Sequence, residues 1–411
     1  MLTHTSMSQK TAHYLHLEEE FGAHNYHPLP VVLERGDGVF LYDVDGKRYY
    51  DFLSGYSAVN QGHCHPRIIH KLIEQAQKLT LTSRAFHSNL LGEYAQFITS
   101  YFGFDKVLPM NTGVEAVETA IKLARRWGYV NKGIEENKAK IIVCEQNFHG
   151  RTSTVISFST DPSSYTKFGP FMPGFEVVEY DNLPALEKAM QDKNVAGFLF
   201  EPIQGEAGVK VPADGYIQGI RALCNEYNVL MIADEIQTGL ARTGKMLACD
   251  HENVKPDILI LGKALSGGTI PVSAVLANND IMLNIKPGEH GSTYGGNPLA
   301  CAVAIESLKV LKEENMTDNA AAMGELFRNM LKQLQSPFIT TIRGKGLLNA
   351  IVVSHSNPDA AWELCLELKA NGLLAKPTHG DKIRFAPPLL ITAEQVHECV
   401  GIIEKSLTIL A

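Results

Sequence analysis

The sequence predicts an α/β fold, with a large domain built on a mainly parallel sheet flanked by helices and a smaller second domain. Short, nearly continuous apolar runs recur along the chain, which is typical of strands buried on both faces of a sheet. Helical patterns such as residues 219–227 separate several of these runs, as the crossovers of a parallel sheet require. The 411 residues are 45% hydrophobic and 20% charged, an ordinary globular composition with enough chain for more than one domain.

Five apolar runs are the expected strands of the large sheet. They are residues 140–144, 195–200, 229–233, 258–261 and 273–277. Residues 115–127 are expected to form a helix, because Val117, Ile121 and Ala124 fall on one stripe at helical spacing. These elements define the large domain.

The pattern changes at Pro298, where a long amphipathic helix begins. A smaller C-terminal domain is expected from this point, with strand regions at residues 344–353 and 383–385. Its closing helix should start at Thr392, since Gln395 follows three residues later and completes a capping box.

Charge and cysteine content exclude several function classes. The formal net charge is −8, the wrong sign for a surface that binds nucleic acid. The seven cysteines are spread out without a CxxC pair, which indicates reduced thiols in a cytosol-like compartment. Residues 1–13 contain neither an arginine nor an apolar stretch, and the apolar runs are too short to cross a bilayer. We therefore expect a cytoplasmic protein with neither a nucleic-acid partner nor a membrane partner.

Asp234 and Lys263 each follow an apolar run that is predicted to be a strand. Because the carboxyl ends of parallel strands meet at one edge of the sheet, both side chains should reach one pocket. A lysine buried there is costly while charged, so it should either pair with an acid or have a lowered pKa and act as an amine nucleophile. Spacing alone leaves an ion pair between Lys263 and Asp234 as an open alternative.

Three further segments carry groups that suit a phosphate and an aromatic ring. The start of the helix at Thr112, Gly113 and Val114 presents free amides to an anion, although a simple N-cap is the alternative. Residues 291–297, GSTYGGN, form a second glycine-rich turn with hydroxyls, and residues 147–151, NFHGR, bring an aromatic ring and an arginine to a strand end. Together with the lysine and the carboxylate, these groups match what pyridoxal phosphate requires.

The chain resembles the ornithine aminotransferases, which are class III, fold-type I pyridoxal-phosphate enzymes, from about Tyr26 to the C-terminus. The stretches that carry the resemblance are MNTGVEAVETAIKLARRWGY, FHGRT, EPIQGEAG, ADEIQTGLARTGK, LGKALSGG, PGEHGSTYGGNP, RGKGLLNAI and LLAKPTHGDKIRFAPPL. The resemblance implies a seven-stranded sheet in the large domain. It also implies an N-terminal segment packed with the small domain over residues 1–60, a large domain over 61–296 and a small domain over 297–411.

The resemblance also implies the residues that hold the cofactor. Lys263 would be the Schiff-base lysine and proton shuttle, and Asp234 would pair with the pyridine nitrogen. The remaining cofactor contacts would be Thr112, Gly113 and Val114 at the phosphate, Phe148 stacked on the ring, Gln237 at the phenolic oxygen, and Ser292 and Thr293 reaching the phosphate from the neighbouring subunit. A homodimer with shared active sites, or a larger assembly of such dimers, is therefore expected.

The implied reaction transfers the δ-amino group of L-ornithine to 2-oxoglutarate in a ping-pong sequence. Arg151 would grip a substrate carboxylate, and Arg384 would grip the α-carboxylate of 2-oxoglutarate. Glu206 would mask Arg384 while ornithine is bound, and Tyr26 and Tyr56 would line the ornithine side. One departure from the expected pattern is Gly55, which stands where a side chain is expected and frees the local backbone.

Several alternatives remain open at this stage. The amino donor could instead be acetylornithine, 4-aminobutyrate or lysine, since related enzymes share the Glu206 and Arg384 pair. Without the resemblance, Arg384 would be interpreted as an ordinary strand-surface arginine. A catalytically idle, cofactor-sensing regulator would need a DNA-binding domain or a basic face, and the sequence offers neither. His63 and His65 are only two residues apart and lack a distant pair of ligands, so no metal site is expected.

Overall fold

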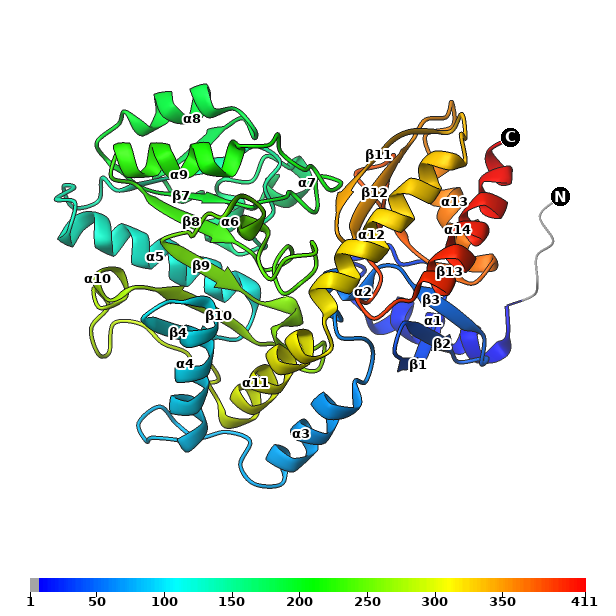
Figure 1. The fold of residues 1–411 in the computed structure, drawn as a ribbon, viewed down its shortest axis with the longest axis horizontal. Helices are drawn as coiled ribbons and strands as arrows, with labels where there is room; N and C mark the ends of the chain where they lie inside the picture. Colours follow the sequence, from blue (N-terminus) through cyan, green and yellow to red (C-terminus); the bar gives the residue numbers. More distant parts are fainter. Residues whose placement is uncertain (1–6) are drawn as a thin grey trace.

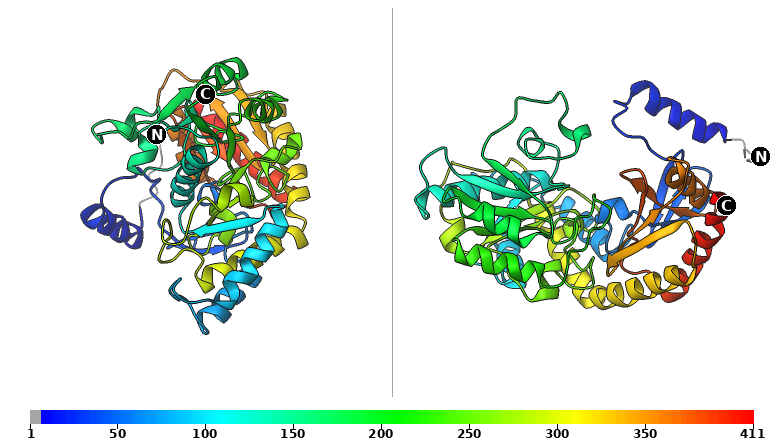
Figure 2. Two further views of the ribbon diagram at one scale, coloured as in Figure 1. Left: turned by 90° about the vertical axis from the view of Figure 1, so that its left-hand side faces the viewer. Right: turned by 90° about the horizontal axis from the view of Figure 1, so that it is seen from above.

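The computed structural model describes residues 7–411; residues 1–6 of the N-terminal segment lie outside the described part. Figure 1 shows two lobes joined by the helices α11 (Pro298–Glu313) and α12 (Met316–Gln333), with the C-terminus on the smaller lobe. Helix α1 (Gln9–Phe21) projects from the smaller lobe in both views of Figure 2. The boundaries at residues 60 and 296 stay predictions.

The large lobe holds a mixed seven-stranded sheet, which confirms the predicted fold class. Four of its six strand pairings are parallel, and β10 is antiparallel to both of its neighbours. The strand order is β4 (Lys106–Met110), β10 (Ser273–Ala277), β9 (Ile258–Leu261), β8 (Leu230–Asp234), β7 (Val195–Phe200), β5 (Lys140–Cys144) and β6 (Phe175–Val178). All five apolar runs named above are therefore strands of this sheet.

Helices cover both faces of the sheet, which explains why its strands are continuously apolar. Ile141 and Val143 of β5 face a core formed with α5 (Gly113–Val130), whereas Ile142 and Cys144 face a second core. That second core is closed by α8 (Leu183–Met190) and α9 (Tyr216–Glu226). The other helices of this lobe are α3 (Pro66–Ala76), α4 (Asn89–Phe102), α6 (Ser153–Ile156), α7 (Pro162–Tyr165) and α10 (Asn279–Met282).

The smaller lobe combines the two ends of the chain in two four-stranded sheets. One has the order β1 (Leu33–Asp37), β2 (Phe40–Asp43), β3 (Arg48–Asp51) and β13 (Leu373–Leu374). The other has the order β11 (Ile339–Lys345), β12 (Leu348–Val353), β15 (Lys382–Phe385) and β14 (Lys376–Thr378). The parallel pairing of β3 with β13 joins the N-terminal segment to the C-terminal part of the chain.

Two expectations for the smaller lobe can be compared with the structure. The closing helix α14 (Ala393–Leu407) starts after Thr392 with the expected capping box. The region 344–353 is a hairpin rather than one strand, because Gly346 has a φ of 55° and turns the chain between β11 and β12. Helix α13 (Ala360–Ala370) completes the lobe together with the short helix α2 (Ser54–Ser57).

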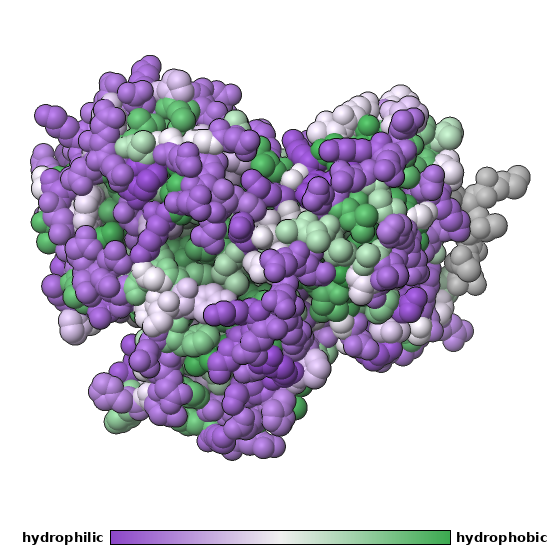
Figure 3. All heavy atoms as spheres, in the orientation of Figure 1, coloured by the Kyte–Doolittle hydropathy of each residue, from purple (hydrophilic) through white to green (hydrophobic). Residues whose placement is uncertain are grey.

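The surface drawn in Figure 3 is mostly hydrophilic with smaller hydrophobic areas, as expected when the apolar residues form the cores. Within residues 7–411, none of the helices is both long and apolar enough to cross a bilayer.

Gly324 marks the tightest contact between α12 and the β11–β12 hairpin. A Cβ atom at Gly324 would collide with the backbone of Gly346, whereas one at Gly401 of α14 would meet open space. We expect Gly324→Ala to lower the free energy of unfolding by about 1–3 kcal/mol, and Gly401→Ala to raise it by up to about 1 kcal/mol. Thermal unfolding of both variants measures this. Equal shifts in the two proteins would contradict the packing described here.

Candidate active site

The carboxyl ends of the central strands meet at one cavity of about 250 Å³. Asp234 ends β8, and Lys263 follows β9 at the start of a short 3-10 helix. The loop after β5 adds Phe148, and the loop after β7 adds Glu206. The residues named above that line this cavity are Gly113, Val114, Phe148, Glu206, Asp234, Gln237 and Lys263. Because the carboxyl ends of parallel strands meet at one edge of the sheet, which we call the strand-end rule, segments that are far apart in the sequence come together here.

Lys263 enters the cavity without an ion-pair partner among residues 7–411. Burial lowers the pKa of Lys263 below its usual value, and the carboxylates of Glu206 and Asp234 oppose that shift. Lys263 has a φ of 43°, so its backbone adopts the left-handed conformation that side chains rarely take. The alternative of an ion pair between Lys263 and Asp234 is wrong, because Asp234 bonds a different residue.

That residue is His149, which the sequence analysis passed over although it lies between Phe148 and Arg151. His149 Nδ1 donates to Asp234 Oδ2 at 2.7 Å, and the Ile236 amide donates to Asp234 Oδ1 at 3.0 Å. Burial alone would lower the pKa of His149, but the Asp234 carboxylate raises it above its usual value. Among the described residues, His149 Nε2 is buried without a hydrogen-bond partner.

A second group that the sequence analysis missed is Glu201, which directly follows β7. Its side chain accepts a hydrogen bond from the Phe148 amide at 3.0 Å and lines the same cavity. Burial raises the pKa of Glu201 to about 7. The sequence pattern could have indicated Glu201 as a site residue, because Glu201 follows the apolar run 195–200 just as Asp234 follows the run 229–233.

The start of α5 forms a cradle for an anion. Thr112 is the N-cap: its Oγ1 accepts from the Glu115 amide at 3.4 Å, and its own amide donates to Glu115 Oε2 at 2.7 Å. The Thr112 hydroxyl is thus used within the helix, while Gly113 and Val114 line the cavity. A Cβ at Gly150 would collide with Val114, so glycine lets the Phe148 loop approach the helix start.

Ser292 and Thr293 lie outside the cavity of their own chain. Ser292 Oγ accepts from Asn111 Nδ2 at 2.7 Å and from the Gly295 amide at 3.2 Å. Thr293 is exposed, and neither hydroxyl is among the groups that line the cavity with Lys263.

Arg384 and Glu206 join the two lobes across the cavity. Arg384 Nη1 donates to Glu206 Oε1 at 2.6 Å, and Gln237 Nε2 donates to the same oxygen at 3.2 Å. Burial raises the pKa of Glu206, but Arg384 outweighs this and holds it below the usual range. Only 3% of Arg384 is exposed, so its interpretation as a strand-surface arginine is wrong.

Of the three remaining substrate-side residues, Tyr56 contacts this ion pair, whereas Tyr26 lines a separate pocket with residues 15–30 and Arg151 lies beside Phe148. The Arg384 guanidinium lies 5.1 Å from the centroid of the Tyr56 ring. Burial and the Glu206 carboxylate raise the pKa of Tyr56, and the positive charges of Arg384 and Arg151 oppose that shift. Tyr26 is 64% exposed, and the Arg151 guanidinium lies 5.8 Å from the Phe148 ring.

The local backbone explains why glycine stands at position 55, where a side chain was expected. Residues Ser54 to Ser57 all have positive φ angles, with 55° at Gly55 and 60° at Tyr56. This left-handed turn aims Tyr56 toward Arg384, and glycine adopts such a conformation without strain.

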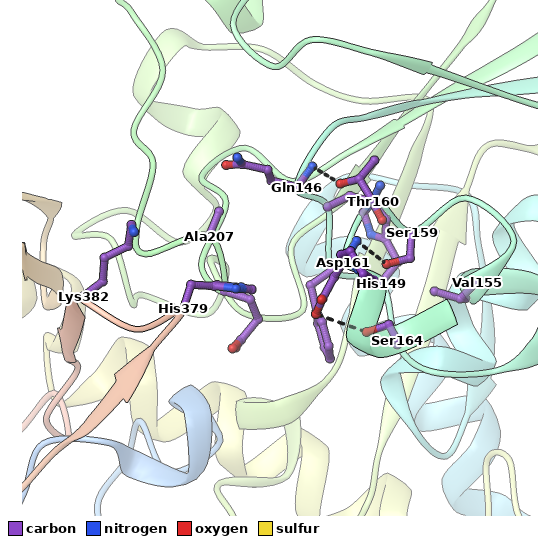
Figure 4. Close-up of a pocket in the computed structure, with 15 residues that line it drawn as sticks. Gln146, His149, Val155, Ser159, Thr160, Asp161, Ser164, Ala207, His379 and Lys382 are labelled. Atoms are coloured by element: carbon purple, nitrogen blue, oxygen red, sulfur yellow. Dashed lines mark hydrogen bonds between the residues drawn. The ribbon is translucent and has the colours of Figure 1, made fainter. Parts of the chain in front are cut away.

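A second cavity of about 260 Å³ adjoins the first and shares Phe148, His149 and Glu206 with it. Figure 4 shows His379 and Lys382 of the smaller lobe on one side of this cavity, with Asp161 and Ser164 of the large lobe opposite. The site therefore lies at the junction of the two lobes.

Comparison with known proteins identifies the family. The chain matches the description "Aminotransferase class-III" over residues 21–407. It belongs to the class III aminotransferases. The mitochondrial ornithine aminotransferase of Drosophila melanogaster is 64% identical over 390 residues, which cover 95% of this chain and 90% of that protein.

Solved structures of class III aminotransferases share the whole fold. The ornithine aminotransferase of Toxoplasma gondii, described with partial occupancy of PLP at its active site, has a TM-score of 0.96 and 49% identity. The match covers 97% of this chain and 94% of that one. The acetylornithine aminotransferase of Elizabethkingia anophelis has a TM-score of 0.89 and 58% identity, and the match covers 97% of this chain and 99% of that one.

The relatives also correct the expected location. The fly protein is named mitochondrial, as are the relatives from Rattus norvegicus and Caenorhabditis elegans. The cytoplasmic location expected from the cysteines and from residues 1–13 is therefore wrong. Reduced thiols indicate a reducing compartment without showing which one, and residues 1–6 lie outside the described part of the chain.

The cavity fits pyridoxal phosphate, the cofactor of class III aminotransferases. It contains an amine without an ion-pair partner among the described residues, at Lys263, and a carboxylate at the end of the neighbouring strand, at Asp234. A Cβ at Gly113 would lie 3.1 Å from Ile236 Cδ1, so glycine allows the helix start to pack closely against Ile236 beside the cavity. These are the amine, the acid and the anion cradle that the cofactor needs.

Glu201 should make the stability of the cofactor-free protein depend on pH. Its pKa is about 7 in the folded protein against an ordinary value of 4.5, so the folded state binds more protons between these values. The free energy of unfolding must then fall as the pH rises through this window. Relative to Glu201→Gln, we expect the wild type to lose up to about 3 kcal/mol between pH 4.5 and pH 8. Urea unfolding at several pH values measures this; a difference that does not change with pH would contradict it.

Proposed function

We propose that this class III aminotransferase transfers the δ-amino group of L-ornithine to 2-oxoglutarate. The products would be glutamate and glutamate 5-semialdehyde, which cyclises to pyrroline-5-carboxylate and connects arginine degradation with proline biosynthesis. The observation that carries the proposal is the ion pair between Glu206 and Arg384 beside the Lys263 amine. This pair allows one site to accept two substrates that differ in the position of their α-carboxylate.

The cofactor residues are assigned by their places around the cavity. Lys263 would hold the cofactor covalently, Asp234 would bind the ring nitrogen, and Phe148 would stack on the ring. Gln237 would contact the phenolic oxygen, and the amides of Gly113 and Val114, with Thr112 fixing the helix start, would bind the phosphate. When bound, pyridoxal phosphate supplies an electron-accepting ring that stabilises negative charge on the substrate carbon.

The proton chemistry falls to two groups of this chain. The lowered pKa of Lys263 allows a neutral amine near neutral pH, so Lys263 Nζ would move a proton from the δ-carbon toward the cofactor in the first half-reaction and move one in the opposite direction in the second. The bond from His149 fixes the orientation of Asp234 and supports its negative charge. Asp234 can therefore hold a proton on the ring nitrogen.

The two substrates would use the arginines in turn. Ornithine would place its α-carboxylate on Arg151, with Tyr26 and Tyr56 along its chain, while Glu206 neutralises Arg384. 2-Oxoglutarate would bring two carboxylates, one to Arg151 and the α-carboxylate to Arg384. For that, Glu206 has to release Arg384, and Gln237 offers Glu206 a second hydrogen bond.

The proposal includes a homodimer in which each subunit completes the other's site. Ser292 and Thr293 lie outside the cavity of their own chain, on a glycine-rich turn where Thr293 is exposed. The exposed Thr293 hydroxyl, and the Ser292 O–H that is left to donate after its oxygen accepts from Asn111 and Gly295, would reach the phosphate site of a partner subunit.

A second candidate donor is N-acetylornithine, since the Elizabethkingia anophelis structure reported above carries that name. Acetylation removes the positive charge of the α-amine and adds bulk beside the α-carboxylate. The partly exposed setting of Tyr26 and Arg151 is compatible with either donor, and donor rates distinguish them.

A panel of amino donors with 2-oxoglutarate as acceptor tests the proposal. We expect ornithine to give the highest kcat/KM. Acetylornithine and 4-aminobutyrate, which lack a charged group of ornithine, should be at least about tenfold poorer, because such a mismatch costs about 1.5–3 kcal/mol. Lysine, which is one methylene longer, should also be about tenfold poorer or more. Lys263→Ala is the control and should lose turnover and the absorption of covalently held cofactor. A clear preference for acetylornithine would contradict the substrate proposed here.

The proposed contact between Thr293 and the phosphate site of a partner subunit predicts weaker cofactor binding in Thr293→Ala. Losing a hydrogen bond to a charged phosphate should weaken cofactor affinity by roughly ten- to a hundredfold. Titration of the apoenzyme with pyridoxal phosphate measures it. Thr340→Ala is a matched control, since Thr340 is an exposed threonine on β11. Unchanged affinity in a folded Thr293→Ala dimer would count against the contact.

A further inference from the structure

Arg242 is the largest fully buried side chain among the described residues, with 0% of its surface exposed. The hydrogen-bond acceptors of its guanidinium are all uncharged oxygens, and the Asp51 carboxylate acts on it only through its charge. Nε and Nη2 donate to Asn60 Oδ1 at 3.2 and 2.6 Å, and Nη1 donates to the carbonyls of Leu347 at 3.0 Å and Pro387 at 2.6 Å. Burial lowers the pKa of Arg242 to about 9. A charge in this position is costly, which indicates a specific role.

The partners of Arg242 belong to separate segments, and several of these carry a substrate-side residue. Asn60 follows the left-handed turn that holds Tyr56. Pro387 follows β15, which carries Arg384. Arg242 itself belongs to the loop after β8 that carries Gln237. One guanidinium therefore fixes three segments whose side chains converge on the Arg384 carboxylate site.

Backbone hydrogen bonds complete the same junction. The Ala386 amide donates to the Phe52 carbonyl at 2.8 Å, and the Leu389 amide donates to the Asn60 carbonyl at 2.8 Å. The Tyr56 turn is thus bonded on both sides to the segment that follows Arg384. Asn60 Nδ2 also donates to the Leu240 carbonyl at 2.8 Å, which ties the turn to the Arg242 loop.

We propose that Arg242 is a positioning residue for substrate carboxylate recognition, which sets the mutual placement of Tyr56, Gln237 and Arg384. This inference rests on the function proposed above. Arg242 is not among the residues that line the cavity with Lys263. Its removal should therefore affect the recognition of carboxylates rather than the retention of cofactor. Lysine cannot replace it, because one ammonium group cannot reach the three acceptors that the planar fork joins.

The test is Arg242→Lys in the holoenzyme, with Arg328→Lys as the matched control. Arg328 Nη1 also donates to the β11–β12 hairpin, at the Gly346 carbonyl at 2.7 Å and at Asn349 Oδ1 at 2.8 Å. Unlike Arg242, it bonds neither the segment after the Tyr56 turn nor the segment after Arg384. We expect Arg242→Lys to raise KM for 2-oxoglutarate and for glutamate about tenfold or more, with kcat changed less than about threefold. Its cofactor absorption should match that of the wild type, and Arg328→Lys should keep the wild-type KM values.

Two outcomes would overturn the inference: an unchanged KM in Arg242→Lys, or a loss of cofactor that accounts for the whole defect. If Arg242→Lys fails to fold, Asn60→Ala provides the test, because it removes the acceptor of two Arg242 hydrogen bonds. Asn60→Ala should raise the same KM values. Wild-type KM values in this variant would overturn the inference. The glutamate half-reaction does not depend on the amino donor. The role of Arg242 can therefore be decided even if ornithine proves to be the wrong substrate.

Discussion

The ion pair between Glu206 and Arg384 is the interaction on which the site depends. Arg384 is buried and Glu206 is mostly buried, and their pair joins the loop after β7 to strand β15 beside the amine of Lys263. A buried pair stabilises little in itself, but loss of either partner leaves an unpaired charge. In the proposed function, the positive charge of Arg384 would become available only when Glu206 leaves it; Gln237 already donates to the same Glu206 oxygen and would keep that bond.

The chemical groups gather because parallel strands end at a common edge. Asp234 and Lys263 arrive from adjacent strands, Phe148 and Glu201 from the next ones, and the helix start at Gly113 closes the pocket. The bond between His149 and Asp234 fixes the acid. The burial of Lys263 favours its neutral form, so the same fold supplies both a rigid acid and a mobile base.

Much of this arrangement could be predicted from the sequence. The apolar runs gave the strands, and the strand-end rule placed Asp234 and Lys263 in one pocket. The partner of Asp234 could not be predicted, because it depends on the side-chain orientation of His149 in a loop. Glu201 obeys the same strand-end rule as Asp234 and was overlooked. Arg384 required the resemblance to a family, since a strand arginine does not reveal its own burial, and Arg242 lies in a polar loop that suggests a surface position.

The most direct test of the account is the fate of ornithine in Glu206→Gln, which removes the charge that masks Arg384 and keeps the shape of the side chain. Single-turnover mixing of the holoenzyme with ornithine, with the products separated, reports which amine is lost. The account predicts that the wild type gives only glutamate 5-semialdehyde, whereas the variant also releases the product of α-amine loss and reacts faster with glutamate. Exclusive δ-transfer in the variant, with an unchanged glutamate rate, would contradict it.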